Sequence, residues 1–417
     1  MPKSPPTKRL ALICQHFYPE MISTGLFITQ LATGLAQMGW AVRVYCGRPI
    51  YEEGVEQPIS PSYETYQGVE IIRVPAWGSG RGALWQRALN AITFLLFVGW
   101  RLLRDRRILY GVVNTTNPPF LGLLAVLVRR LVGLPFVTVV HDLYPEVAIR
   151  LGLLSSTSLV TRTWEWLTRC ILEHSAGVVV IGRDMEQLVR SKLKDPSTAK
   201  VTLIPHWSDV EQTPPANAEI KAFLQQHGIQ DKLVVQYAGR LGRIHNLEVL
   251  LDAAHLLQNE PVHFQFIGDG AKRRALSAKA QQLKLTNVQF LPSQPYHELP
   301  TMLAAAQVGV VCLESNCTGV SVPSKSYGIM ASRRPILALL DRASEIGQMV
   351  QETGCGLVLD AATGIEVATA IRQLQANPAQ LCALGERGYQ AFQQNYTQAL
   401  ALKRYAAFLE SHLPVVD

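Results

Sequence analysis

The sequence predicts an α/β protein with two Rossmann-like domains, each built around a parallel sheet. Short apolar runs alternate with amphipathic stretches of helical period, which is the pattern of a parallel sheet with helices on both faces. The alternation breaks once near the middle and then recurs, and 417 residues are too many for one hydrophobic core. We therefore expect an N-terminal domain over residues 1–205, a C-terminal domain over 206–390, and a C-terminal helix within 391–417 that packs back on the first domain.

In the first half, apolar runs rich in β-branched residues predict strands, and apolar residues at helical spacing predict helices. The expected strands are 10–16, 41–45, 69–74, 109–114, 136–140, 177–181 and 201–204. The expected helices are 27–38, 120–132 and 159–174. Residues 205–218 are rich in proline and polar side chains, which indicates a linker between the domains.

In the second half, the same reasoning gives strands at 233–238, 262–267, 288–291, 308–313, 336–340 and 357–359. Helices are expected at 247–257, 272–283, near 299–305, and in the remaining residues as far as 413. Ligands of open parallel sheets bind at the carboxyl ends of the strands. Two such domains that face each other would therefore bind a ligand in a cleft between them.

Charge and cysteine content narrow the class of protein. The net charge of +7 and the pI near 9.0 favour an anionic partner such as a nucleotide, a nucleic acid or an acidic lipid surface. A nucleic acid is disfavoured because the arginines are dispersed with few interleaved aromatic residues. The seven cysteines are scattered and include no C-x-x-C pair, so neither a disulfide framework nor a zinc site is indicated. With no apolar secretory core near residue 1, a cytoplasmic location is expected.

The longest apolar segment spans residues 88–103 and is flanked by arginines. Arg101 interrupts it, and it is shorter than the roughly 20 residues that cross a bilayer. It is either a buried helix of the first domain or a helix in the membrane interface with its arginines against anionic headgroups.

A phosphate-binding turn is expected after the strand at 233–238. The strand stops at Gly239, a basic turn with Arg240 and Arg243 follows, and a helix of period 3.6 comes next. Glycine lets the backbone approach an anion, the helix start offers unpaired N–H groups, and Arg240 adds a charged fork. A second tight turn, formed by Gly268, Asp269 and Gly270, follows the next strand and is suited to closing a nucleotide pocket.

A second group of anion-binding candidates lies at an expected helix start, where Pro323 precedes Ser324 and Lys325. Ser324, its neighbouring N–H groups and Lys325 could hold a diphosphate opposite Arg240. The alternative is an ordinary capped helix with a surface lysine.

The first half offers two weaker candidates. Ser23, Thr24 and Gly25 precede a helix and could meet a phosphate, or Thr24 could simply cap the helix. His141 and Asp142 end a strand, where His141 could position or proton-couple a substrate hydroxyl and Asp142 could bind or activate another. A purely structural role for this pair is the alternative. No G-x-G-x-x-G is present, which argues against a dinucleotide dehydrogenase.

Taken in order, these motifs resemble the family-4 retaining glycosyltransferases over nearly the whole chain. The matching segments are YPE with Gly25 five residues after the glutamate, VHDLYPE, VTLIPHWSD, QYAGRLGRIHNLEVLLDAA, FIGDG and VPSKSYGIMASRRPI. They are most similar to the branch that assembles bacterial surface polysaccharides, including transferases of the colanic acid type. The resemblance implies a GT-B fold, with the acceptor bound by the first domain and a nucleotide-sugar by the second.

The resemblance also assigns residues. It implies that Arg240 grips the diphosphate and that His141 contacts the donor sugar. A second basic position, a lysine in the family, falls on His245 and loses its permanent charge. Two family glutamates spaced eight apart fall on Val320 and Gly328, which leaves ribose binding unassigned.

The remaining groups in this region suggest substitutes. Ser324 and Lys325 can supply the phosphate contacts, and Glu314 and Glu345 are nearby carboxylates at other spacings.

The expected function is therefore a retaining hexosyltransferase of cell-surface polysaccharide biosynthesis, at the inner face of the plasma membrane. It would move a sugar from a nucleotide-diphosphate donor to a glycan or lipid-linked acceptor. We expect no cofactor and no metal, because no D-x-D motif is present and cations and amides can stabilise the leaving diphosphate. A non-hydrolysing sugar-nucleotide epimerase and a non-catalytic GT-B scaffold, the latter motivated by Gly328 and Val320, are the alternatives.

Overall fold

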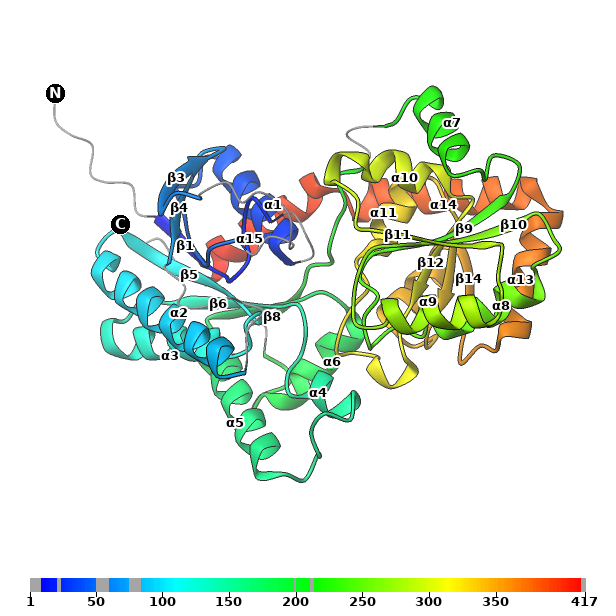
Figure 1. Cartoon of the computed structure of the whole chain (residues 1–417). Helices are drawn as coiled ribbons and strands as arrows, with labels where there is room; N and C mark the ends of the chain where they lie inside the picture. The colour runs from blue at the N-terminus through cyan, green and yellow to red at the C-terminus, as the bar shows by residue number, and fades with distance from the viewer. Residues whose placement is uncertain are drawn as a thin grey trace. The chain divides into compact units, whose positions relative to one another are not determined.

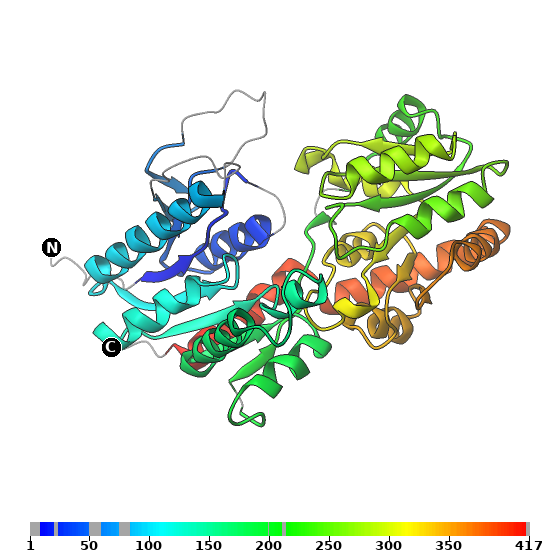
Figure 2. The same cartoon turned by 60° about the horizontal axis from the view of Figure 1, so that its bottom comes forward.

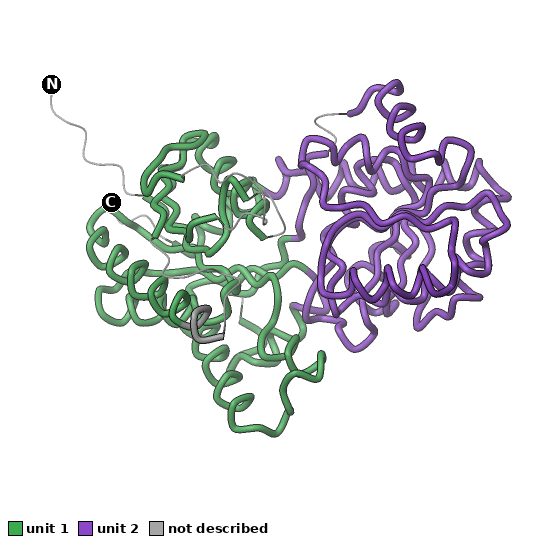
Figure 3. Tube along the Cα trace, in the orientation of Figure 1, with its two compact units in different colours: residues 1–181, 186–204, 402–417 green, residues 182–185, 205–401 purple. Residues whose placement is uncertain are grey.

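The chain folds into two compact units. The computed structural model describes residues 9–20, 24–49, 60–74, 84–198, 200–210 and 214–413, without the side chains of residues 84–88. Unit 1 comprises the described residues within 1–181, 186–204 and 402–417, and unit 2 those within 182–185 and 205–401 (Figures 1 and 3). The cleft expected between the two domains stays a prediction.

The unit boundaries differ from the expected ones at two places. The C-terminal part of unit 1 begins at residue 402 rather than 391, because α14 (Pro378–Asn395) packs against α11 (Lys325–Ala331) and α13 (Gly364–Ala376) of unit 2. Residues 182–185 also belong to unit 2. Arg183 forms an ion pair with Glu345 there, and Asp184 accepts a hydrogen bond from the N–H of Gly319 at 2.9 Å.

Unit 1 contains an eight-stranded sheet with the order β3-β4-β2-β1-β5-β6-β7-β8. The strands are β1 (Arg9–Ile13), β2 (Val42–Cys46), β3 (Tyr63–Tyr66), β4 (Val69–Arg73), β5 (Leu109–Thr115), β6 (Phe136–Val140), β7 (Gly177–Val180) and β8 (Val201–Leu203). All pairs are parallel except β3 with β4. The antiparallel edge strand β3 was not predicted, because YETY is short, polar on one side and half-exposed.

Helices cover both faces of this sheet (Figures 1 and 2). They are α1 (Thr24–Gln37), α2 (Leu84–Asp105), α3 (Leu121–Val132), α4 (Glu146–Arg150), α5 (Leu159–His174), α6 (Arg183–Lys192) and α15 (Gln398–His412). Helices α2, α3 and α5 share one apolar core with β1 and β5, and α15 packs with α1 on the opposite face. Leu402 of α15 lies against Gly34 of α1, and Phe408 lies against Gly177 of β7.

Helix α2 has two apolar stripes. Phe94, Val98 and Leu102 are spaced four residues apart and pack into the core of unit 1, where Val98 is fully buried. Leu96 and Trp100 face away from the core, with 68% and 50% of their surface exposed. The apolar segment is thus a helix of the first domain on one side. Its other side keeps the exposed apolar stripe that a membrane-interface helix needs.

None of the helices in the described part of the chain is both long and apolar enough to cross a bilayer.

Unit 2 contains a six-stranded, wholly parallel sheet with the order β11-β10-β9-β12-β13-β14. The strands are β9 (Leu233–Ala238), β10 (Val262–Ile267), β11 (Val288–Leu291), β12 (Val308–Cys312), β13 (Ile336–Leu339) and β14 (Gly356–Leu359). The interior strands β9, β10, β12 and β13 are almost wholly buried, as a sheet covered on both faces requires.

Two layers of helices enclose the second sheet (Figure 1). Helices α8 (Glu248–Leu256), α9 (Arg273–Gln282) and α13 share an apolar core with β9 and β10 on one face. The other face carries α10 (Leu299–Ala305), α11, α12 (Glu345–Thr353) and α14, with α7 (Asn217–Gln226) packed on α10. The predicted strands and helices of this half are therefore confirmed within one or two residues at their ends.

Substitutions can distinguish the buried stripe of α2 from the exposed one. Val98→Asp should lower the free energy of unfolding by roughly 3 kcal/mol or more, because a carboxylate would be buried without a partner. Leu96→Asp should change it by less than about 0.5 kcal/mol, because that side chain already meets water. Urea denaturation of both variants beside the wild type measures the difference. Equal losses would contradict the assignment of the stripes.

Candidate functional site

The turn after β9 lies where the strand order of unit 2 reverses, between β9 and β12. Open parallel sheets bind ligands at this position. Gly239 follows β9 with φ at +135°, and Gly268 follows β10 with φ at +130°. A Cβ at position 268 would lie 2.1 Å from the carbonyl oxygen of Gly239, so only glycine fits. The two strand ends therefore pack backbone against backbone.

Hydrogen bonds fix the loop between β9 and α8. The N–H of Leu241 donates to the carbonyl oxygen of Asp269 at 2.9 Å. The ammonium of Lys272 donates to the carbonyl oxygen of His245 at 2.8 Å and to the carboxylate of Glu248 at 2.9 Å. The carboxylate of Asp269 accepts from the next N–H at 2.7 Å, so it stabilises its own turn. The loop is held from the ends of both β10 and α8.

His245 lies inside this loop as a neutral imidazole. Its Nδ1 accepts a hydrogen bond from the N–H of Gly242 at 3.2 Å, which places its proton on Nε2. Burial lowers the pKa of His245 to about 2, and the nearby cations add to that shift. The imidazole orders the loop and supplies no charge to an anion.

Lys325, the first residue of α11, brings its ammonium to the Gly239 turn. Its Nζ lies 3.5 Å from the centre of the Tyr237 ring, and a Cβ added to Gly239 would lie 3.4 Å from it. This nitrogen is buried and has no hydrogen-bond partner among the residues that the structure describes. Burial lowers the pKa of Lys325 to about 8. An ammonium that is buried without a counter-ion provides a position for an anion.

Arg240 and Ser324 complete this group. Arg240 is exposed, and within the described ranges its guanidinium makes no ion pair or hydrogen bond. Ser324 occupies the N-cap position of α11, yet its hydroxyl makes no capping hydrogen bond. The lysine is therefore not the surface residue of an ordinary capped helix. We call Gly239, Arg240, Ser324 and Lys325 the phosphate cluster.

In unit 1, Gly25 lies in the first turn of α1. A Cβ at Gly25 would lie 2.7 Å from the carbonyl oxygen of Glu20, so the loop after β1 closes tightly over the helix start. Helix α1 begins at Thr24, and Ser23 lies outside the described residues. Whether Gly25 meets a phosphate stays a prediction.

His141 and Asp142 follow β6 and share one backbone anchor. The hydroxyl of Thr116, just after β5, accepts from the N–H of His141 at 3.1 Å and from that of Asp142 at 3.4 Å. Burial lowers the pKa of His141 to about 4, so the imidazole is neutral at physiological pH. His141 can exchange a hydrogen bond with a substrate but carries no charge to it.

The two carboxylates suggested as substitutes, Glu345 and Glu314, are engaged elsewhere. Glu345 is buried and accepts from the backbone N–H of Arg183 at 2.7 Å. Glu314 is half-buried and pairs with Lys272 at 3.3 Å. The two family glutamate positions, Val320 and Gly328, are both buried. Across the described ranges, no group of three or more His, Cys, Asp or Glu side chains could hold a metal ion.

Comparison with known proteins decides the family. One model, a glycosyl transferase 4-like domain, matches residues 24–207, and another, glycosyl transferases group 1, matches residues 219–391. The probable glycosyltransferase WbjE of Pseudomonas aeruginosa is 31% identical, over 84% of this chain and 85% of its own length. The chain belongs to the family-4 glycosyltransferases. The epimerase and scaffold alternatives therefore receive no support.

Two further comparisons agree with this assignment. The putative colanic acid biosynthesis glycosyl transferase WcaI of Escherichia coli is 26% identical, over 81% of this glycosyltransferase and 84% of its own chain. A solved structure of Anabaena HepE in complex with UDP-glucose superposes with a TM-score of 0.72 at 15% identity, covering 97% of this chain and 99% of that one. The fold is GT-B.

The structure divides the residues predicted for the site of this glycosyltransferase between its two units. Gly25, His141 and Asp142 lie in unit 1. The members in unit 2 are Gly239, Arg240, His245, Gly268, Asp269, Ser324 and Lys325. Tyr237, Lys272 and Thr116 were missed. A tyrosine two residues before the strand-end glycine was the available signal for Tyr237, but nothing local marks the partners of Lys272 or Thr116.

The cost of burying Lys325 can be measured. Its pKa lies below that of an unfolded lysine, so the unfolded state binds more protons between about pH 8 and 10.5 and wild-type stability should rise with pH across that window. Lys325→Met should lack this rise. The variant should be more stable than wild type at pH 7, by roughly 3 kcal/mol at most.

Thermal melts of both proteins at pH 7, 8 and 9.5 test this, with Lys232→Met as the control for a lysine at the other end of β9. If the melting temperatures of wild type and Lys325→Met change in parallel with pH, burial of the Lys325 ammonium does not destabilise the fold.

Proposed function

We propose that this glycosyltransferase takes a sugar from a nucleotide-diphosphate donor bound at the phosphate cluster and transfers it to a glycan or lipid-linked acceptor, with retention of anomeric configuration. The observation that carries this proposal is the buried Lys325 ammonium, which faces the Gly239 turn with no hydrogen-bond partner in the described structure. A diphosphate would supply the missing counter-charge.

The chemistry needs a stabilised leaving group. When the bond from the anomeric carbon to the phosphate oxygen breaks, its electron pair stays on the β-phosphate. Lys325 and Arg240 favour that charge because they are already in place before the reaction. The acceptor hydroxyl oxygen forms the new bond on the face that the phosphate leaves, and its proton passes to the departing phosphate.

Unit 1 would bind the acceptor and the donor sugar. Neutral His141 can accept from or donate to one sugar hydroxyl, and Asp142 can accept from another. Thr116 holds both residues through their backbone N–H groups, so a sugar would meet groups that are already oriented. The name of WcaI supports a role in polysaccharide biosynthesis, that of WbjE supports glycosyl transfer, and HepE with UDP-glucose supports a nucleotide-sugar donor.

Arg240→Ala should reduce turnover by about a hundredfold or more while the melting temperature stays within a degree or two of wild type. The reason is that an exposed cation leaves no packing defect but its loss weakens charge-assisted bonds to the leaving phosphate. The measurement is nucleotide release from a panel of UDP-, GDP- and dTDP-sugars.

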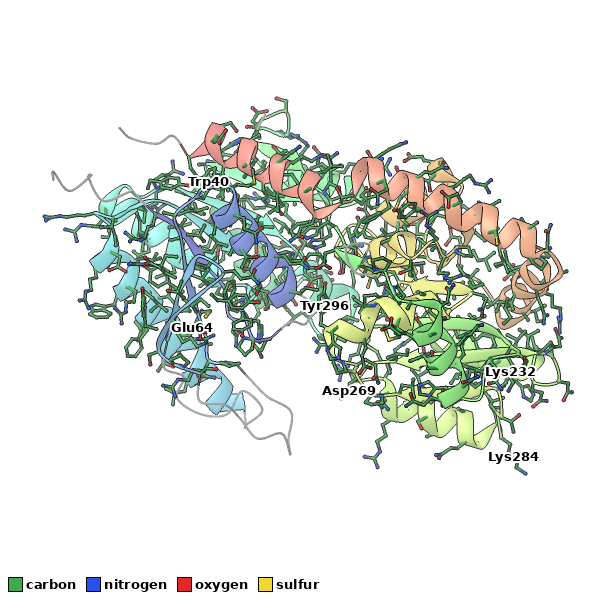
Figure 4. All side chains as sticks on the ribbon, turned by 90° about the horizontal axis from the view of Figure 1, so that it is seen from above. Trp40, Glu64, Lys232, Asp269, Lys284 and Tyr296 are labelled. Carbon is green, nitrogen blue, oxygen red and sulfur yellow. The ribbon has the colours of Figure 1, made fainter. Side chains whose placement is uncertain are left out.

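Lys232→Ala is the matched control, because Lys232 lies at the opposite end of unit 2 from Asp269 (Figure 4). Unchanged turnover in Arg240→Ala, or equal losses in both variants, would refute the phosphate cluster.

We also propose that unit 1 docks on an anionic membrane through the exposed side of α2, α3 and α5. These neighbouring helices expose large apolar side chains, namely Ile92, Leu96, Trp100, Leu127, Leu131 and Trp166. The guanidinium groups of Arg101 and Arg104 lie 5.0 and 5.3 Å from the centre of the Trp100 ring. An aromatic side chain flanked by cations suits the boundary between acyl chains and anionic headgroups.

Flotation with vesicles tests this surface. Wild type should float with vesicles that contain about a third phosphatidylglycerol and should be released by high salt, because the headgroup attraction is screened. Replacing Leu96 and Trp100 together by Ser should reduce recovery in the floated fraction several-fold. Met38→Ser, at an exposed residue after α1, is the control. Equal recovery of all three proteins would reject this surface.

A further inference from the structure

We infer that Asp209, oriented by Tyr296, binds the ribose hydroxyls of the nucleotide. This inference rests on the proposed function, because it presupposes a nucleotide diphosphate at the phosphate cluster. It gives a carboxylate to a site where the family position, Gly328, has none. A ribose presents two neighbouring hydroxyl donors, and an ionised carboxylate accepts both.

Asp209 follows Ser208, which lies next to the part of α11 that comes after Lys325. A Cβ added to Gly328 would lie 3.8 Å from the hydroxyl oxygen of Ser208, the residue before Asp209. Gly328 is three residues beyond Lys325, or roughly 4.5 Å along the helix axis. The ribose of a nucleotide is joined directly to its diphosphate, so a ribose carboxylate must lie about this close to the phosphate cluster.

A small hollow lies beside α11, and its lining includes Ala238, Leu303, Lys325 and Ile329. Leu303 also lies close to Gly328, because its Cδ1 would lie 3.2 Å from a Cβ there. Lys325 therefore lines this hollow, and Ser208 lies against the same helix at Gly328, about one turn later.

The backbone beside Asp209 is fixed. The N–H of Ser208 donates to the carbonyl oxygen of Tyr396 at 3.3 Å, and its hydroxyl accepts from the N–H of Val210 at 3.2 Å. The phenol hydroxyl of Tyr296 donates to the carboxylate of Asp209. Tyr296 belongs to the 3-10 turn η2 (Tyr296–Glu298) after β11, so two segments far apart in sequence orient this carboxylate.

The position in the unit agrees with a ligand role. Figure 4 shows Tyr296 and Asp269 at one end of unit 2, and Lys232 and Lys284 at the opposite end. Asp269 follows β10, and Lys232 precedes β9, so the first end is the carboxyl edge of the sheet. This is the edge at which parallel sheets bind ligands. The competing explanation is that Asp209 only attaches the segment after β8 to unit 2.

Ribose discrimination separates the two explanations. The probes are UDP, GDP and their 2′-deoxy counterparts, titrated by calorimetry into the full-length protein. Wild type should bind the better ribonucleotide about ten- to a hundredfold more tightly than its deoxy form, the factor expected for a hydrogen bond to a charged group. Asp209→Asn, which can still accept from Tyr296, should bring this ratio close to one while deoxynucleotide affinity stays unchanged. Tyr296→Phe should give an intermediate ratio.

Asp252→Asn on α8 is the matched control, because Asp252 is an exposed carboxylate that pairs with Lys279, and it should keep the wild-type ratio. A wild-type ratio in Asp209→Asn, or equal weakening of both nucleotides, would overturn the ribose role and assign Asp209 to structure. In either case diphosphate binding that depends on Lys325 would leave the proposed function standing. Failure of wild type to bind any of the four probes or dTDP would remove both.

Discussion

An ammonium without a counter-ion is the constraint on which this glycosyltransferase site depends. Lys325 places its Nζ over the face of Tyr237, beside a turn whose glycine leaves room for a ligand. A folded protein does not normally bury a charge unpaired, because desolvation costs more than a cation–π contact returns. The cost becomes understandable if a diphosphate occupies the position during the reaction. Binding and leaving-group stabilisation would then use the same charge.

The rest of unit 2 keeps that charge in place. Contact between the Gly239 and Gly268 turns locks the ends of β9 and β10 together, and Lys272 ties the loop after β9 to α8. Neutral His245 supports the loop from inside. If a diphosphate binds here, Lys325 supplies from another segment the charge that His245 lacks. Likewise, if Asp209 binds the ribose, it supplies from another segment the carboxylate that Gly328 lacks.

Sequence reasoning predicted the architecture and part of the candidate site, and particular residues show the physical reason. Buried parallel strands such as VVQYA and VHFQFI are mostly apolar and stop at a glycine, so local pattern was enough to place them. The edge strand YETY has no such pattern. The expected domain boundary at residue 390 falls inside α14, because the partners of α14, α11 and α13, cannot be predicted from its own residues. Spacing predicted Gly239, Arg240 and Lys325 as site residues, and the structure brings Lys325 to the Gly239 turn. Spacing could not reveal three contacts that depend on packing between distant segments. They are the contact of Tyr237 with the ammonium of Lys325, the hydrogen bonds of Lys272 to three acceptors, and the hydrogen bond between Tyr296 and Asp209.

Proton uptake on nucleotide binding tests the central claim most directly. With a pKa of about 8, free Lys325 is partly deprotonated at pH 8.5, and a bound diphosphate must raise that pKa. Calorimetric titration of the tightest-binding nucleotide diphosphate in two buffers of different ionisation enthalpy counts the protons. We expect wild type to take up a substantial fraction of one proton at pH 8.5, more than at pH 7, and Lys325→Met to take up correspondingly less. The same proton count in both proteins at pH 8.5 would show that the buried ammonium does not meet the diphosphate.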